Sequence, residues 1–257
     1  MIVTETNLIG FDVFLGSKKP ENLRNAAAPC PFCDVRHLTD IIDKDGDIIL
    51  LKNKYNVITE AEQFVIIESA ECKKDMPMYS KEYMRRLIRF SVKHWQNFID
   101  SGKYEDVLFF KNFGIMSGGT ISHPHMQIVG FPKLNTGLTF SKKEFEGIEI
   151  IKKDGVNFNA ATYPRVGFGE LNLVANKLNY NIDTLADFIR ISVDYIMNNF
   201  NKRVTSYNIF FYYDEENIYV KTMPRFATSP LFIGYNIRFL PNNMDNIAKE
   251  IKDLYFA

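Results

Sequence analysis

The stretch Asn112-Phe-Gly-Ile-Met-Ser-Gly-Gly-Thr-Ile-Ser-His-Pro-His-Met-Gln127 contains two of the four histidines of this 257-residue chain, His123 and His125. The apolar run 128–131 that follows predicts a strand that begins near the second histidine. Because alternate residues of a strand point to the same side, His125 and Gln127 should project together. The stretch therefore predicts an imidazole and a carboxamide on one face of a sheet.

A loop of small residues precedes the histidines: Ser117, Gly118, Gly119 and Thr120. Glycines let backbone N–H groups approach a bound anion closely, as in loops that cradle phosphate. Such a loop beside His125 and Gln127 favours chemistry at phosphorus, on a nucleotide or a similar phosphate ester. Two other interpretations remain open: the loop is an ordinary polar turn, or the two histidines only bind a metal.

Composition excludes several classes of protein. The formal net charge is zero, with 31 basic and 31 acidic residues, so no global field attracts nucleic acid. No apolar run reaches the roughly 18 residues of a membrane span, and the N-terminus does not look like a signal peptide. Three cysteines fit a reducing compartment better than a disulfide framework. We therefore expect a cytoplasmic protein that binds neither nucleic acid nor membranes.

Hydrophobic periodicity predicts a similar order of elements in the two halves. After an irregular arm over 7–31, the first half should hold a hairpin, a strand, a helix and two strands: 41–51, 64–67, 80–99, 107–110 and 125–131. The second should hold a strand, a helix, two strands and a last helix: 170–174, 185–200, 207–213, 218–223 and 244–255. Residues 136–159 are expected to connect the halves.

This order predicts an α+β fold of two strand-helix-strand-strand repeats, residues 1–135 and 136–257, with a mainly antiparallel sheet. The strand 218–223 holds the place in the second repeat that the histidine strand holds in the first. It carries no histidine. The second half is therefore expected to be a degenerate copy, with one active centre per chain in the first half.

The motif Cys30-Pro-Phe-Cys33 has a spacing that two chemistries share. A redox pair would lie at a helix N-terminus after a strand, whereas this pair follows an irregular, proline-rich arm, which favours a structural zinc with four ligands. Cys72 is the only other cysteine. His123, which precedes a strand, is the natural fourth ligand, and His37 is the competing one. His94 should be solvated on the polar side of its helix.

Together these residues resemble the galactose-1-phosphate uridylyltransferases and their relatives in the histidine-triad superfamily. The family pattern of Asn-x-Gly, small residues and His-Pro-His-x-Gln is matched in order and spacing by residues 112–127. The resemblance covers much of residues 28–132. It is weaker in the second half, where 169–171 and 233–235 are similar to family segments near the nucleotide. It implies two histidine-triad-like halves, and it makes a homodimer possible.

The resemblance also implies roles for single residues. The metal ligands would be Cys30, Cys33, Cys72 and His123, with Cys72 where the family has a histidine, and with zinc as the metal or iron as the alternative. The residues that contact the phosphate and nucleotide would be Asn53, Asn112, Ser117, Gly118, Gly119 and Thr120, with Asn53 at the ribose. The histidine ligands of a second metal in the best-known uridylyltransferases have no counterpart here, which leaves the base and the sugar undetermined.

For the mechanism, the resemblance implies that His125 attacks the α-phosphorus of a nucleoside diphosphate derivative and that a second phosphate then takes the nucleotide. Hydrolytic relatives carry a histidine where this chain has Gln127, which can donate a hydrogen bond but cannot transfer a proton. We therefore expect a nucleotidyltransferase or phosphorylase, with a nucleoside diphosphate sugar or dinucleoside polyphosphate as donor and a phosphate as acceptor. The alternatives are a nucleotide hydrolase and a non-catalytic nucleotide-binding protein.

Overall fold

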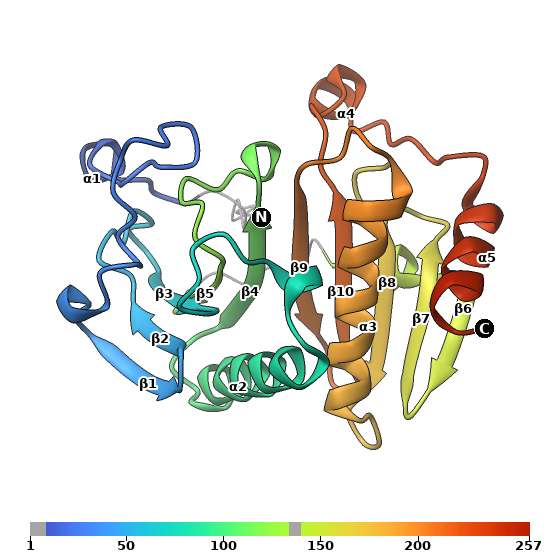
Figure 1. The fold of residues 1–257 in the computed structure, drawn as a ribbon, viewed down its shortest axis with the longest axis horizontal. Coiled ribbons are helices and arrows are strands. Elements are labelled where there is room, and N and C mark those ends of the chain that lie inside the picture. Colours follow the sequence, from blue (N-terminus) through green and yellow to red (C-terminus); the bar gives the residue numbers. More distant parts are fainter. Residues whose placement is uncertain (1–8, 134–139) are drawn as a thin grey trace, which may run out of the picture. The chain divides into compact units, whose positions relative to one another are not determined.

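The computed structural model describes residues 9–133 and 140–257, which form two compact units (Figure 1). The described part of the first unit contains residues 9–74, 90–111, 120–133 and 140. The second contains residues 75–89, 112–119 and 141–257. The expected boundary between the halves, at 135/136, lies outside the described residues.

The first unit holds an antiparallel sheet with the strand order β1-β2-β3-β5-β4. Its strands are β1 (Ile41–Asp45), β2 (Ile48–Lys52), β3 (Glu62–Ile67), β4 (Asp106–Phe113, of which the last two residues belong to the second unit) and β5 (His125–Phe131). The short helix α1 (Val13–Ser17) interrupts the N-terminal arm, which was expected to be irregular. The start of that arm, before residue 9, lies outside the described residues.

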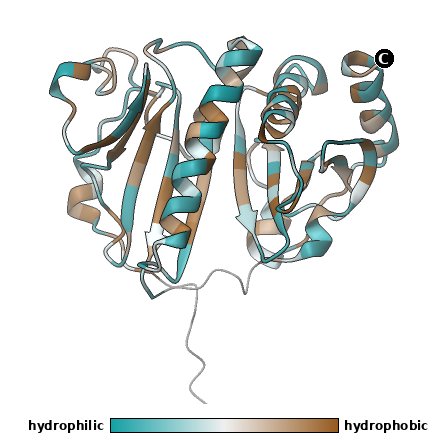
Figure 2. Ribbon diagram, turned by 90° about the horizontal axis from the view of Figure 1, so that it is seen from below, coloured by the Kyte–Doolittle hydropathy of each residue, from teal (hydrophilic) through white to brown (hydrophobic). Residues whose placement is uncertain are grey.

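Helix α2 (Lys81–Asp100) supplies the aromatic side chains that pack on this sheet. Trp95 is fully buried and its Nε1 donates a hydrogen bond to the carbonyl of Val107, 2.9 Å away. Phe98 stacks on Phe64 of β3, with ring centroids 4.4 Å apart. Figure 2 shows the hydrophobic and hydrophilic residues of the helices on different sides, as expected for amphipathic elements.

The second unit holds a further antiparallel series of strands in the order β9-β10-β8-β7-β6. These strands are β6 (Gly147–Lys153), β7 (Val156–Ala161), β8 (Leu171–Asn176), β9 (Tyr207–Tyr213) and β10 (Asn217–Pro224). The helices are α3 (Ile182–Asp194, continued by a π-helical turn, Tyr195–Phe200), α4 (Pro230–Tyr235) and α5 (Met244–Tyr255). Helix α3 packs on β8 and β10, and α5 packs on β6 and β7.

The core of the second unit encloses a buried ion pair between Lys221 of β10 and Glu170, 2.9 Å apart and both fully buried. The Lys221 ammonium also donates to the Asn172 side-chain oxygen at 2.7 Å and to the Glu144 carbonyl at 2.8 Å. The Glu170 carboxylate accepts hydrogen bonds from the backbone N–H groups of residues 165, 166 and 167. Each charge in this network is thus paired and hydrogen-bonded, as a buried charge requires.

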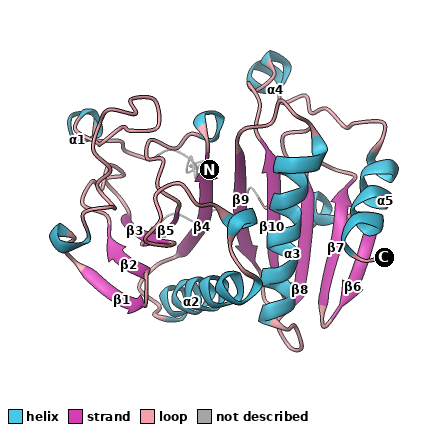
Figure 3. Cartoon of the chain, viewed as in Figure 1, coloured by secondary structure: helices cyan, strands magenta, loops and turns pink. Residues whose placement is uncertain are grey.

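The two units use the same order of elements: a hairpin, a strand, a helix and two strands, with the last strand between the other two (Figure 3). In the first unit this central strand is β5, and in the second it is β10. The order places the histidine strand and its expected counterpart in matching positions of their sheets.

One expectation about the second half is wrong. Residues 136–159 do not simply connect the halves, because 147–161 form the hairpin β6–β7. Its turn is Asp154-Gly155, where both residues have positive φ, +48° and +75°. Asp-Gly is a strong hairpin signal. The charged residues of the strand Gly147–Lys153 masked it, since only Ile150 of β6 is buried.

His94 also differs from the expectation of a solvated side chain. It is 8% exposed, its Nε2 lies 2.9 Å from Asp43 Oδ2, and its ring packs edge-on against Phe90. Burial lowers the pKa of His94, and the Asp43 carboxylate acts in the opposite direction. Among the described residues, none of the helices has the length and apolar character that crossing a membrane requires.

Candidate active site and metal centre

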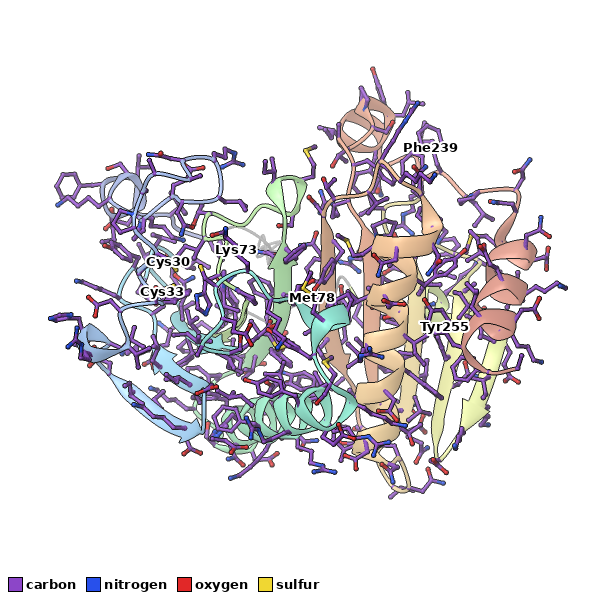
Figure 4. All side chains as sticks on the ribbon, in the orientation of Figure 1. Cys30, Cys33, Lys73, Met78, Phe239 and Tyr255 are labelled. Carbon is purple, nitrogen blue, oxygen red and sulfur yellow. The ribbon has the colours of Figure 1, made fainter. Side chains whose placement is uncertain are left out.

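Four side chains of the first unit converge on one point: Cys30, Cys33, Cys72 and His123, whose ligand atoms all lie within 4.8 Å of one another. The Nδ1 atom of His123 is 3.6 Å from the Sγ atoms of both Cys30 and Cys33. A tetrahedral zinc with ordinary Zn–S and Zn–N bonds requires S···N separations of about 3.6 Å. The donor set and the spacing therefore fit zinc. Figure 4 shows Cys30 and Cys33 side by side.

The second ring nitrogen of His123 holds the ring in place. Nε2 is 2.8 Å from the carbonyl of Ser69, to which it donates, so Nδ1 keeps the lone pair that a metal needs. His37, the competing ligand, is largely exposed and pairs with Asp34 at 2.7 Å. The described cluster therefore contains His123 and not His37.

The thiols of the cluster differ in acidity. Burial raises the pKa of Cys30, but its contact with His123 and a hydrogen bond from the Phe32 backbone outweigh it and lower this pKa to about 6. Cys30 is therefore available near neutral pH as a thiolate, the form that binds metals.

His125 is the first residue of β5 and is 7% exposed. Its Nδ1 lies 2.7 Å from the carbonyl of His123, to which it donates, so the lone pair is on Nε2. Burial lowers the pKa of His125 to about 4, and the nearby cations Lys111 and Lys19 add to this effect. The ring is thus held as a neutral imidazole of one tautomer.

Phe32, between the two cysteines of the motif, contacts both histidine rings. Its ring centroid lies 5.9 Å from that of His123 and 5.4 Å from that of His125, in edge-to-face arrangements. Phe32 also packs on apolar residues of β2 and β3. Sequence reasoning did not find this contact, because which ring packs on a histidine far along the chain depends on tertiary structure.

A buried ion pair in the first unit also escaped the sequence analysis. Lys111 of β4 and Glu68, just after β3, are fully buried and paired. The Glu68 backbone N–H donates to the Pro124 carbonyl, inside the His-Pro-His turn. The one signal in the sequence is a lysine that ends the apolar run of β4.

Gln127 and Asn53 belong to the first unit as well. Gln127 is half-buried on β5, opposite Val65 and Phe110, and its side chain makes no hydrogen bond within residues 9–133 and 140–257. Asn53 follows β2, and its Oδ1 accepts from the Tyr55 backbone N–H at 2.9 Å. Its Nδ2 makes no hydrogen bond with the described part of the chain.

The small-residue loop is divided between the units. Thr120 belongs to the first unit, where its carbonyl accepts from the N–H groups of Asn22 and Leu23. Asn112, Ser117, Gly118 and Gly119 belong to the second. The Asn112 Oδ1 accepts from Asn208 of β9 at 2.6 Å, and the Ser117 hydroxyl donates to the Gly114 carbonyl at 2.6 Å.

Two glycines of this loop have defined reasons to be glycine. Gly114 has φ +81°, and a Cβ there would lie 2.3 Å from the Thr205 carbonyl oxygen. Gly118 has φ +89°, and nothing lies within 4 Å of the place where its Cβ would be. The backbone at Gly118 is therefore open to a ligand, as loops that bind anions require.

Comparison with known proteins gives a consistent picture. The profile described as "Domain of unknown function (DUF4931) N-terminal domain" matches residues 11–134, and the corresponding C-terminal domain matches residues 137–256. A DUF4931 family protein of Bacillus cereus is similar in structure, with 36% sequence identity, TM-score 0.77, and coverage of 85% of this chain and 100% of that one. Among curated proteins, no sequence matches.

Two more distant structures share the fold. An ADP-glucose phosphorylase of Arabidopsis thaliana, solved with bound ADP-glucose, has 12% identity and TM-score 0.70, over 93% of this chain and 92% of that one. A uridylyltransferase has 12% identity and TM-score 0.67, over 88% and 90%. The resemblance to the uridylyltransferase-like branch of the histidine-triad superfamily, inferred from the sequence, is thereby confirmed for the fold.

Proposed function

The chain belongs to the DUF4931 family and has the uridylyltransferase-like fold, and from this premise we propose that it is a nucleotidyltransferase that works through His125. One observation carries the proposal. The hydrogen bond from His125 Nδ1 to the His123 carbonyl leaves the Nε2 lone pair as the reactive atom. A nucleophilic histidine must be neutral and of fixed tautomer.

In the first step, Nε2 of His125 attacks the α-phosphorus of the donor. An N–P bond forms, the P–O bond to the leaving phosphate breaks, and that phosphate departs as an oxyanion. The Nδ1 proton stays in its hydrogen bond to the His123 carbonyl throughout. In the second step, an oxygen of the acceptor phosphate attacks the same phosphorus, the N–P bond breaks, and the imidazole is regenerated.

Gln127 favours transfer over hydrolysis. Alternation along β5 puts its side chain on the same side as that of His125, where it can donate to a phosphoryl oxygen but cannot supply a proton to a leaving group. A leaving phosphate needs little acid assistance, because its oxygen is a weak base. The donor is thus best a nucleoside diphosphate sugar or a dinucleoside polyphosphate, and the acceptor a phosphate.

Lys19 supports the choice of an anionic substrate. It is half-buried, has no ion-pair partner within the described ranges, and contributes a positive charge at His125. A partly desolvated ammonium without an ion-pair partner in the described residues is suited to a phosphate group. The side-chain NH2 group of Asn53, which has no partner within the described ranges, is a further donor for the nucleotide.

The cluster of Cys30, Cys33, Cys72 and His123 would hold a structural zinc. Bound there, zinc would fix the conformation of the turn that carries His125 and would not contact the substrate. In keeping with the family relation, the halves 1–135 and 136–257 would be two histidine-triad-like repeats with one active centre, in a cytoplasmic protein that can form a homodimer.

Covalent capture tests the proposal. The protein is incubated separately with uridine- and adenosine-diphosphate sugars and with dinucleoside polyphosphates, and the intact mass is measured. We expect a gain of one nucleoside monophosphate on His125, with the acid-labile, base-stable linkage of a phosphoramidate. His125→Ala should lose the adduct and keep its metal content, whereas His37→Ala, at an exposed histidine, should behave as wild type.

Three outcomes would overturn the proposal. An adduct that persists in His125→Ala would assign the chemistry to another residue. Turnover of a nucleotide with no adduct under any condition would exclude a covalent path, and release of free nucleoside monophosphate would then indicate a hydrolase. Binding of a labelled nucleotide with neither turnover nor adduct would indicate a non-catalytic binding protein.

A further inference from the structure

Asn208 connects Asn112, near the end of β4, with Ser117, which follows it along the chain. It lies on β9 and is 1% exposed. Its Nδ2 donates to the Asn112 Oδ1 at 2.6 Å and to the Ser117 backbone carbonyl at 3.1 Å, and its Oδ1 accepts from Arg225 Nη1 at 2.7 Å. All four residues belong to the second unit.

The chemistry of these partners fixes the direction of every hydrogen bond in the series. A guanidinium only donates and a backbone carbonyl only accepts. Asn208 must therefore turn its oxygen to Arg225 and its NH2 group to Ser117. Asn112, which receives that NH2 group, must then turn its own oxygen inward. The orientation of Asn112 thus follows from Arg225, two side chains away.

The outward group of Asn112 is therefore its NH2. Asn112 is half-buried, its Nδ2 has no partner in the described part of the chain, and this atom is not among the enclosed polar atoms. Arg225 is also half-buried, and it has no carboxylate partner in the described residues, only Asn208 and the Thr228 hydroxyl. A free donor backed by an uncompensated cation is a site for an anion.

We propose that Asn208 and Arg225 are positioning residues that hold the NH2 group of Asn112 outward as a hydrogen-bond donor to an anionic phosphoryl oxygen. Asn112 would then donate a hydrogen bond to the phosphate part of the substrate. It would not accept a hydrogen bond from a ribose hydroxyl. The inference rests on the proposed function for its substrate, a nucleotide diphosphate group, and names the part of it that Asn112 recognises.

The test uses pyrophosphate as the probe and the full-length protein, labelled with ¹⁵N. Asn112→Asp identifies the side-chain NH2 signal of Asn112 by its loss. In Asn208→Asp the carboxylate still accepts from Arg225, but it also demands a donor from Asn112, which must turn its NH2 inward. We expect the Asn112 signal to shift with pyrophosphate in wild type and not in Asn208→Asp. The matched control is Asn176→Asp, because Asn176 uses only its oxygen, toward the Leu178 N–H.

Affinity gives a second measurement that does not depend on the fate of Asn208→Asp. Asn112→Asp keeps the acceptor for Asn208 but presents a carboxylate outward, so pyrophosphate binding should weaken about tenfold or more, with little change in melting temperature. Unchanged affinity in Asn112→Asp would overturn the inference. So would a wild-type-like shift of the Asn112 signal in Asn208→Asp.

The two proposals fail separately. A wild-type protein that forms no nucleotide adduct, but whose Asn112 signal responds to pyrophosphate, would retain the role of Asn112 and end the proposed function. A nucleotide adduct on His125, together with an Asn112 signal that does not shift at saturating pyrophosphate, would support the proposed function and end the role of Asn112.

Discussion

Strands β5 and β10 occupy the same place in the strand order of their units, but their polar side chains differ in what they leave unpaired. On β10, the Lys221 ammonium has three acceptors, and the carboxylate it pairs with has three backbone donors besides. On β5, His125 uses one ring nitrogen, and its Nε2 has no partner in the described part of the chain.

The difference teaches how one arrangement of strands can serve two purposes. A buried polar network in which every group is satisfied stabilises the unit but has no capacity left for a ligand. A site that reacts needs an atom left unpaired within surroundings that are otherwise satisfied. In the first unit His125 has such an atom, whereas the ion pair of Lys221 and Glu170 in the second unit is satisfied on both sides.

Among the substitutions that test the difference between β5 and β10, His125→Ala should have the largest effect. Nucleotidyl transfer should fall about a thousandfold or more, because the nucleophile is lost. Stability should fall by no more than about 2 kcal/mol, since the buried ring makes one hydrogen bond and one edge-on contact with Phe32. Steady-state turnover and urea unfolding of the same preparations measure the two effects. Equal losses of activity and stability would mean that His125, like Lys221, serves the fold.

Loss of a metal ligand should affect the first unit through its fold. Cys72→Ala should retain less than about half an equivalent of zinc and lose several kcal/mol of unfolding free energy, because metal binding contributes directly to folding. Elemental analysis and urea unfolding are the measurements. Wild-type protein that itself carries less than half an equivalent of zinc or iron would contradict the metal site.

Lys221→Met should cost about 3 kcal/mol of unfolding free energy, because it leaves the Glu170 carboxylate buried without its cation. The matched control is Lys249→Met, at an exposed pair with Asp253, where we expect a change below about 1 kcal/mol. Urea unfolding of both variants gives the comparison. A similar loss of unfolding free energy in both variants would mean that the buried ion pair of β10 stabilises the unit no more than an exposed pair does.

The smallest effect should come from Gln127→His, which changes the chemistry of β5 without disturbing its packing. The new side chain can relay a proton to water or to the leaving group, so the ratio of hydrolysis to transfer should rise about tenfold. Product partitioning measured with a labelled donor is the readout. An active variant with unchanged partitioning would exclude the role assigned to Gln127.

Much of this fold could be predicted from its apolar runs. The strand 207–213 and the helix 244–255 have the bounds expected from periodicity. The hairpin β6–β7 could not be found in this way, because an edge strand with one solvated face shows little apolar signal. The Asp154-Gly155 turn was the feature to use there.

The candidate site was predictable where its chemistry is carried by residue type. Three cysteines and a histidine form one cluster in the structure, as the Cys-x-x-Cys motif and the family resemblance together implied. Asn208 and Arg225 were not predictable, because an asparagine on a strand and an arginine after one have no distinctive pattern. Lys111 ends the apolar run of β4, but its pairing with Glu68 appears only once the strands are adjacent.

The contacts of Phe32 affect how inhibition by a chelator should be interpreted. Phe32 lies between two residues of the metal cluster and packs on His125, and His125 donates to the carbonyl of a third cluster residue. Removing the proposed zinc would release the turn that carries His125. The Nε2 atom of His125 would then be misaligned, although it never contacts the zinc. Chelators should therefore inactivate the protein slowly, in step with loosening of that turn, and such inactivation is not a sign of a metal at the reacting phosphorus.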